Sequence, residues 1–288
     1  MTDAIDIDES YLKEKIKPRR LDSRKGDNGS VLIVGGNTVY HGAPVLASIA
    51  ASRSGADLVY VGVPRSIVDP VRSASPCIIV LPMSDNSLTV GSGNRLIGML
   101  PKRVDSAAIG MGMTIAKGEA LINLVRKLRD NGTRIILDAS ALTPGILDEI
   151  IGTDTVITPH LGEYNRIFGV ELRNIEDDLV KSVIHNAAKF KLTIVLKGSL
   201  NIIADKDGKL AKIRRTTPAM TIGGSGDVLD GILATFFAKM DAFDASVLAV
   251  HFNGQAAYMA FVETGLHIIA TDIINNLSRV MKKYDVIE

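Results

Sequence analysis

The sequence predicts an α/β protein built on a mostly parallel, doubly wound sheet with antiparallel strands near one edge. Short apolar runs rich in β-branched residues recur along the chain, and several lack the polar alternation of a strand with one solvated face. Segments with the apolar period of helices lie between many of these runs, which is typical of βαβ units and hence of a parallel sheet. No low-complexity linker or repeat divides the sequence, so we expect one domain spanning 1–288.

The expected strands are the apolar runs, in chain order 31–36, 58–63, 77–81, 107–111, 134–138, 155–158, 193–197 and 201–204. The last two are closely spaced and are followed by 208–214, so these three segments predict antiparallel strands near an edge. The expected helices are 42–55, 117–132 and 176–190, followed by 226–239, 244–263 and 270–283.

Composition excludes several classes of protein. With 33 Lys and Arg against 32 Asp and Glu, the chain lacks the basic excess of a general polyanion binder, so we expect no nucleic-acid partner. The N-terminus has no long apolar run, which excludes a secretory signal or a membrane anchor there. A single cysteine, Cys77, excludes an intramolecular disulfide and suits the reducing cytoplasm, where we expect the protein to reside.

The loops that follow the expected strands carry an unusual share of glycine and polar residues. They are "GGNTVYHGAP", "GMGMT", "DASAL", "TPHLGE" and "KGS". Ligands of an open parallel sheet bind at the carboxyl ends of its strands, where such loops converge. The sequence therefore predicts a site at this edge of the sheet.

The segment "TIGGSGDVLDGI" (221–232) places glycines and a carboxylate at the start of an amphipathic helix. Gly223, Gly224 and Gly226 allow close approach to a ligand, and the first helical turn offers unpaired N–H groups that suit an anion. Asp227 lies in that turn. Taken alone, the segment is better explained as a tight turn in which the Asp227 carboxylate interacts favourably with the helix dipole.

Two further motifs have both a functional and a structural explanation. In "TPHLGE", His160 and Glu163 are three residues apart, so they either contact a polar ligand and a metal-bound water or begin a helix with Glu163 in its first turn. In "VLKGSLNII", Lys197 and Gly198 either meet a nucleotide phosphate or form a hairpin with a solvated lysine.

Together, the motifs resemble the ribokinase-like superfamily, and within it the ADP/ATP-dependent NAD(P)H-hydrate dehydratases. The resemblance covers about residues 24–284. It rests on motifs that follow one another in family order: the segment from "KGDNGSVLIVGGN" to "LVYVGVP", then "AIGMGM", "LDASAL", "TPHLGEYNRIFG", "VLKG", "GGSGDVLDGILA", "AVHFNGQAA" and "HIIATDIINNLSRVM". Their joint occurrence is far more specific than any one of them.

The resemblance implies a three-layer α/β/α fold and repair of hydrated NADH or NADPH, with ADP or ATP as co-substrate and Mg²⁺. A phosphoryl group would pass to the ring hydroxyl and leave as phosphate, with Asp227 as the catalytic base. By motif, the hydrated dinucleotide would contact Ala43, Gly112, His160 and Asp227. The nucleotide would contact Lys197, Gly198, Ser199, Leu200, Asn201, Gly223, Gly224, Ser225 and Gly226, and Glu163 would order Mg²⁺ through water.

The sequence also departs from the family pattern. Ser140 stands where the family often has a second Asp, and "TTPAM" replaces an Asn-Pro-Gly-Met segment, so both changes bear on nucleotide contacts. Many relatives carry an N-terminal epimerase domain, whereas only an extension of residues 1–23 precedes the matching region here. We therefore expect any epimerase to be a separate protein.

Two other functions compete with the dehydratase. A ribokinase-like kinase of hydroxymethylpyrimidine or a sugar would share Asp227 and the glycine loop, and a nucleotide sensor would share the loop without needing a base. The loops "GGNTVYHGAP" and "TPHLGE" favour the dehydratase. We also expect a homo-oligomer, with a tetramer as one form, assembled through the apolar helices after residue 244.

Overall fold

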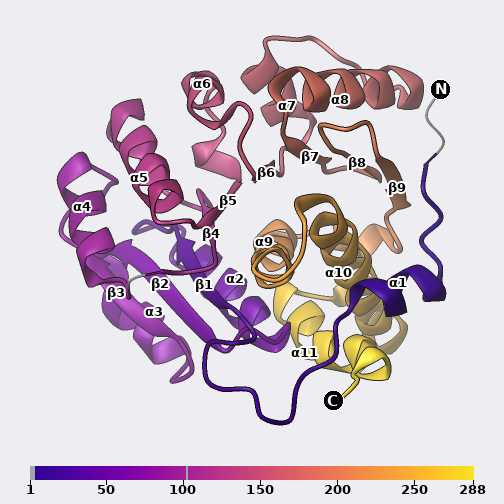
Figure 1. The fold of residues 1–288 in the computed structure, drawn as a ribbon, viewed down its shortest axis with the longest axis horizontal. Coiled ribbons are helices and arrows are strands. Elements are labelled where there is room, and N and C mark those ends of the chain that lie inside the picture. The colour runs from indigo at the N-terminus through magenta and orange to yellow at the C-terminus, as the bar shows by residue number, and fades with distance from the viewer. Residues whose placement is uncertain (1–3, 102) are drawn as a thin grey trace.

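The computed structural model describes residues 4–101 and 103–288, which form a nine-stranded sheet in the order β3-β2-β1-β4-β5-β6-β7-β8-β9 (Figure 1). The strands are β1 (Ser30–Val34), β2 (Leu58–Pro64), β3 (Ile79–Met83), β4 (Ser106–Ile109), β5 (Arg134–Leu137), β6 (Thr155–Ile157), β7 (Thr193–Leu196), β8 (Leu200–Ala204) and β9 (Leu210–Arg214). Strands β1 to β7 pair in parallel, whereas β8 is antiparallel to β7 and β9 to β8. The predicted α/β class and its antiparallel edge are confirmed.

Helices cover both faces of the sheet and complete three layers (Figure 1). One face packs against α2 (Gly42–Arg53), α3 (Val68–Ala74), α9 (Ser225–Phe237), α10 (Ala242–Thr264) and α11 (Ala270–Met281). The other packs against α4 (Val90–Met99), α5 (Gly118–Asp130), α6 (Leu147–Ile150), α7 (Leu161–Phe168) and α8 (Glu176–Phe190). Each face has its own hydrophobic cluster, and the apolar runs of the central strands contribute to both because both faces are covered.

The structure differs from the sequence prediction in a few elements. Strand β3 begins two residues later than expected and continues through Pro82, which an edge strand tolerates because one side of its backbone has no partner strand. Helices α3 and α4 were not expected. Glycines weaken the helical pattern of α4 in the sequence. The helix begins with a capping box, in which Thr89 and Ser92 exchange hydrogen bonds of 2.8 and 3.0 Å.

The N-terminal extension packs against the rest of the chain. It contains α1 (Glu9–Lys15), whose Leu12 is buried, and the hydroxyl of Tyr11 donates a 2.6 Å hydrogen bond to Asp244 at the start of α10. The Lys15 ammonium lies 3.0 Å from the same carboxylate. The extension therefore covers the beginning of α10.

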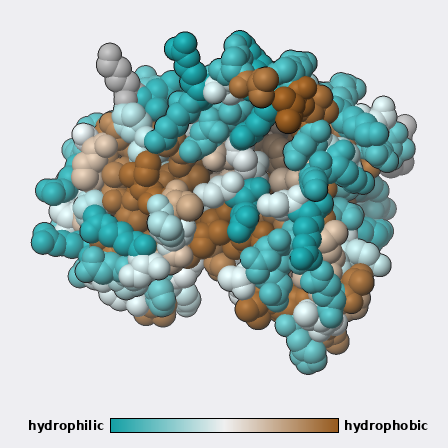
Figure 2. Space-filling model, turned by 90° about the horizontal axis from the view of Figure 1, so that it is seen from below, coloured by the Kyte–Doolittle hydropathy of each residue, from teal (hydrophilic) through white to brown (hydrophobic). Residues whose placement is uncertain are grey.

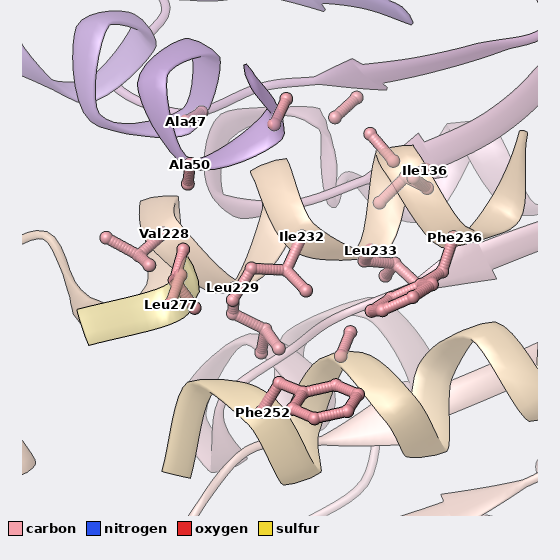
Figure 3. Close-up of a cluster of buried hydrophobic side chains, with 14 of the residues drawn as sticks. Ala47, Ala50, Ile136, Val228, Leu229, Ile232, Leu233, Phe236, Phe252 and Leu277 are labelled. Atoms are coloured by element: carbon pink, nitrogen blue, oxygen red, sulfur yellow. The ribbon is translucent and has the colours of Figure 1, made fainter. Parts of the chain in front are cut away.

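Helix α9 runs through the core between α2 and α10 (Figure 3). Its apolar residues Val228, Leu229, Ile232, Leu233, Phe236 and Phe237 are all buried. Gly231 permits the close crossing with α2, because a Cβ at this position would lie 2.0 Å from the carbonyl oxygen of Ala47. The hydroxyl of Ser106, at the start of β4, bonds the Ala234 carbonyl at 2.6 Å. The C-terminal half of α9 is thus fixed at the amino ends of the strands, and its N-terminus lies at their carboxyl ends.

Within the described ranges, no helix is long and apolar enough to cross a membrane.

Candidate active site

Polar side chains meet at the carboxyl ends of β5, β6 and β7, as the loop composition predicts. Asp138 follows β5, Thr158 follows β6 and Lys197 follows β7. The Lys197 Nζ lies 2.7 Å from Asp138 Oδ1, and the Lys197 amide donates to the Pro159 carbonyl at 2.8 Å, which holds the loops after β6 and β7 together. The hairpin predicted at Lys197 is present, but its lysine is ion-paired and largely buried rather than solvated.

The Lys197–Asp138 pair stays charged despite its burial. Burial alone would raise the pKa of Asp138, but Lys197 outweighs it and holds that pKa below its ordinary value. Burial would likewise lower the pKa of Lys197, but the charge of Asp138 holds it above its ordinary value. The pair therefore places a permanent cation at this edge of the sheet.

That cation lies against the N-terminus of α9. A Cβ built on Gly226 would be 3.5 Å from Lys197 Nζ, so the ammonium reaches the first turn of the helix. Gly224 precedes this turn with a φ of 92°, in the left-handed region, and a Cβ there would lie 2.5 Å from Leu46 and 2.9 Å from Ala270. The N-cap residue, Gly224, has no side chain that could cap the helix, and first-turn N–H groups lack partners within a helix. The helix start and the lysine together make an anion site.

Asp227 is the half-buried carboxyl of the same turn. Burial and then the charge of Asp138 raise its pKa to about 6, and Lys197 opposes that rise. A carboxyl that ionises near neutral pH and lies next to an anion site has the properties of a general base.

A cavity of about 360 Å³ opens beside the anion site. Of the residues predicted to contact a nucleotide, it is lined by Lys197, Gly198, Ser199, Asn201, Ser225 and Gly226. Leu200, Gly223 and Gly224 are not part of the lining. The Asn201 side chain accepts from the Gly198 amide at 3.3 Å and donates to the Ile213 carbonyl at 3.1 Å, so it shapes the turn that forms one wall.

Two other cavities, of about 370 and 430 Å³, lie away from this edge of the sheet. Both are lined in part by the N-terminal extension and the C-terminal helices, and neither is lined by Asp138, Lys197 or Asp227. Although these cavities are as large as the one beside the anion site, they are not candidates for the active site.

The residues predicted to contact the dinucleotide are only partly brought together. Gly112 lies against the start of α2, since a Cβ there would be 3.2 Å from Ala43 Cβ and 2.7 Å from Tyr40 Cβ. His160 lies instead in the β6 loop, where it forms an isolated parallel bridge with Lys197. Asp227 lies in the first turn of α9, a helix that contacts both α2 and the sheet.

His160 and Glu163 form the helix start that was one of the two explanations of their spacing. His160 Nδ1 accepts from the amides of Gly162 and Glu163 at 3.0 and 3.3 Å, and Glu163 Oε2 accepts from the His160 amide at 2.9 Å. This capping box begins α7. The imidazole is largely exposed, so it remains able to meet a ligand.

Three polar residues of the site escape prediction from the sequence. The sequence motifs contain Asp138 only as part of a loop and Asp230 only as part of a helix. Asp230 follows Asp227 by three residues, and this spacing predicts that the two carboxyls lie on the same face of the helix. Asn253 on α10 lines the cavity, donates to the Ser225 carbonyl at 3.3 Å and has a buried Oδ1 without a partner in the described part of the chain. Only the packing of α10 against α9 brings it there.

Comparison with known proteins identifies a matching family. A family model described as NAD(P)H-hydrate dehydratase matches residues 31–279. The chain is 44% identical over 278 residues to the ADP-dependent (S)-NAD(P)H-hydrate dehydratase of Nitrosopumilus maritimus, a match that covers 96% of each chain.

Solved structures show the same architecture. The ADP/ATP-dependent NAD(P)H-hydrate dehydratase of Bacillus subtilis, co-crystallised with ATP and Mg²⁺, superposes with a TM-score of 0.83 at 25% identity, covering 96% of this chain and 98% of that one. A ribokinase-like superfamily protein from Enterococcus faecalis superposes with a TM-score of 0.79 at 25% identity and covers 97% and 95%. The ribokinase-like fold expected from the motifs is confirmed.

Proposed function

The chain belongs to the NAD(P)H-hydrate dehydratase family, and we propose that it restores NADH and NADPH from their hydrated forms with a nucleoside diphosphate as co-substrate. The observation that carries this proposal is the position of Asp227. Its carboxyl has a pKa of about 6 and lies in the first turn of a helix whose N-terminus, together with Lys197, forms an anion site. A base beside a phosphate cradle is what transfer of a phosphoryl group to a hydroxyl requires.

The chemistry follows from the poor leaving ability of hydroxide. The hydroxyl oxygen of the hydrated nicotinamide ring attacks the terminal phosphorus of the nucleotide, and the bond to the bridging oxygen breaks. Asp227 accepts the hydroxyl proton, while the first-turn amides of α9 stabilise the charge on the transferring group. Phosphate then leaves the ring carbon, a proton leaves the neighbouring carbon, and the reduced nicotinamide is restored.

We place the nucleotide in the cavity of about 360 Å³. Lys197 to Ser199 and Asn201 form one wall and Ser225 and Gly226 the other, so the terminal phosphate would point toward the α9 N-terminus. Gly223 and Gly224 shape that N-terminus from outside the lining. ADP is the co-substrate that we favour, because the relative at 44% identity is named ADP-dependent. Asn253 Oδ1 is a buried acceptor in this cavity and is available to the nucleotide.

We place the hydrated nicotinamide on the other side of Asp227. Ala43 and Gly112 approach each other at the start of α2, and the exposed imidazole of His160 stands at the start of α7. Ser140 is half-buried two residues after Asp138, and its hydroxyl replaces the second carboxylate expected from the family pattern. The loop after β5 therefore carries one negative charge fewer than in a chain with Asp at that position.

Mg²⁺ fits this site only together with the nucleotide. No group of three or more His, Cys, Asp or Glu side chains in residues 4–101 and 103–288 is arranged to hold a metal alone. Mg²⁺ commonly binds through one or two carboxylates, waters and substrate phosphates. Glu163 Oε2 accepts from the His160 amide in the α7 capping box, and Oε1 lies 3.4 Å from His160 Nε2. Both oxygens keep free lone pairs, so Glu163 would order a metal-bound water. The ion would supply charge neutralisation of the phosphates.

We also propose that the chain self-associates. Hydrophobic residues gather in patches on one face of the molecule (Figure 2). On α10 and the turn after it, Tyr258, Val262, Leu266 and Ile269 are 48 to 67% exposed. Helical spacing puts Tyr258 and Val262 on one face. Sedimentation equilibrium tests the proposal: Val262→Glu is expected to lower the molar mass, and a wild-type monomer would contradict it.

The product distinguishes the dehydratase from a kinase built on the same fold. Incubation of the protein with hydrated NADPH, ADP and Mg²⁺ is expected to release one inorganic phosphate for each NADPH recovered. Accumulation of a stable phosphorylated dinucleotide, or phosphorylation of hydroxymethylpyrimidine or a sugar in its place, would favour the kinase. Replacing ADP with ATP in the same assay measures the nucleotide preference.

A further inference from the structure

One buried carboxyl of the active site has no role in the reaction described above. Asp230 lies one turn after Asp227 on α9 and is fully buried. Its Oδ1 accepts a hydrogen bond from the Thr158 hydroxyl at 3.2 Å. Its Oδ2 is buried too and receives no hydrogen bond from a donor in residues 4–101 and 103–288. A carboxylate oxygen left in this state is costly, because burial removes the water that would solvate it.

The polar group that acts most strongly on Asp230 is the Asp138 carboxyl, and each of the two groups affects the pKa of the other. Two ionised carboxylates repel each other, whereas a proton on one of them lets it donate a hydrogen bond to the other. Asp138 already accepts from the Lys197 ammonium at 2.7 Å, which favours its charged form. The proton therefore resides on Asp230, and its Oδ2 becomes a hydroxyl donor rather than an orphaned acceptor.

The charges around the cluster lead to the same assignment. Asp138 after β5, Lys197 after β7 and Asp227 on α9 all act on Asp230, and Glu163 on α7 acts on Lys197. Lys197 is the one cation among them and is paired with Asp138. An ionised Asp230 would thus be a second buried anion without a partner of its own. Burial, and then the charge of Asp138, raises the pKa of Asp230 well above its ordinary value.

We propose that Asp230 is a positioning residue, held as a neutral carboxylic acid whose hydroxyl donates to Asp138 and so fixes the Asp138–Lys197 pair against the first turn of α9. Asp138 then accepts from two fixed donors, the Asp230 hydroxyl on α9 and the Lys197 ammonium after β7. The Lys197 ammonium is held beside Gly226, where the nucleotide phosphate is placed. This inference rests on the proposed function for its effect on turnover, but the protonation of Asp230 does not depend on it.

The asparagine variant separates this role from a general need for a polar residue. In Asp230→Asn, the amide oxygen accepts from Thr158 and the amide nitrogen donates to Asp138, which reproduces the pattern of the protonated acid. We expect its turnover and its affinity for ADP to stay close to wild type. Asp230→Ala removes the donor, so we expect kcat to fall about 100-fold with weaker ADP binding and an unchanged KM for the hydrated dinucleotide.

Infrared difference spectroscopy between wild type and Asp230→Asn provides a readout that needs no turnover. The expected result is the loss of one carbonyl band of a protonated carboxylic acid at neutral pH. Loss of carboxylate bands instead would overturn the proposal, as would wild-type turnover and ADP affinity in Asp230→Ala, or an Asp230→Asn variant as impaired as Asp230→Ala. Thr235→Val, which removes a buried hydroxyl elsewhere on α9, is the matched control and should leave both readouts unchanged.

A wild-type protein that fails to dehydrate hydrated NADPH would contradict the proposed function and not this inference. In that case, the infrared band still decides the protonation of Asp230. Calorimetric titration with ADP then compares the two variants, and weaker binding in Asp230→Ala alone is the result that the positioning role requires.

Discussion

The two halves of α9 contrast in almost every physical property. The N-terminal half, from Ser225 to Asp230, contains two carboxyls with raised pKa values and follows a glycine in the left-handed region. The C-terminal half, from Gly231 to Phe237, is entirely buried and packs against α2, α10 and the sheet (Figure 3). The comparison shows that the buried C-terminal half of α9 anchors the helix. This packing compensates for the unfavourable burial of two carboxyls in the N-terminal half.

This contrast predicts opposite responses to substitution. Removal of a functional polar group from the N-terminal half is expected to alter turnover while leaving the fold intact or more stable. Changes in the C-terminal half are expected to lower stability while leaving turnover per folded molecule unchanged.

The largest effect is expected for Asp227→Asn. Loss of the base should lower kcat about 10²- to 10⁴-fold while ADP still binds. The raised pKa of Asp227 means that the fold disfavours its charged form, so at neutral pH the neutral amide should raise the free energy of unfolding by about 1–3 kcal/mol. Steady-state kinetics, calorimetry and urea unfolding measure these three quantities. Full activity in this variant would contradict the role of Asp227 as the catalytic base.

The opposite pattern is expected for Phe237→Ala in the C-terminal half. Phe237 is fully buried, and removing its ring should lower the free energy of unfolding by about 3–5 kcal/mol. Below the unfolding transition, kcat should match wild type. Leu21→Ala, at a position 86% exposed, is the control and should change stability by less than about 0.5 kcal/mol. A large loss of kcat in folded Phe237→Ala would show that the halves are not separable.

A smaller effect is expected for Gly224→Ala at the boundary before α9. The left-handed φ of 92° should cost any other residue about 1–2 kcal/mol, and the new Cβ would press on Leu46 and Ala270. Because this loop shapes the anion site, ADP affinity should fall as well. Unfolding and ADP titration together test the prediction, and Gly208→Ala, at a left-handed turn far from the site, controls for the backbone cost alone.

The smallest effect concerns the pH dependence of kcat/KM. Turnover should fall as pH drops through about 6, where Asp227 takes up a proton and can no longer act as a base. Asp138 raises this pKa and Lys197 lowers it, so the acid limb should move down in Asp138→Asn and up in Lys197→Met. An acid limb that stays in place in both variants would assign it to another group.

How much the sequence predicts depends on the range of the interactions involved. The strand–helix alternation and the amphipathic pattern of α9 are local, and both locate Asp227 in a helical first turn. The meeting of Asp138, Lys197 and Asp230 depends on the order of the strands and on the packing of α9, so it could not be predicted from spacing. His160 and Glu163 show the remaining ambiguity, because a capping box and a ligand site require the same spacing.

The central claim is that Asp227 and the α9 N-terminus drive the removal of water from a hydrated nicotinamide. The most direct test is a single turnover of hydrated NADPH with ADP and Mg²⁺, monitored by the absorbance of the reduced nicotinamide and by phosphate release. We predict that wild type yields NADPH and phosphate in equal amounts and that Asp227→Asn forms both about 10²- to 10⁴-fold more slowly while still binding ADP. Formation of both products by the variant at the wild-type rate, or phosphoryl transfer in wild type without recovery of NADPH, would contradict the account.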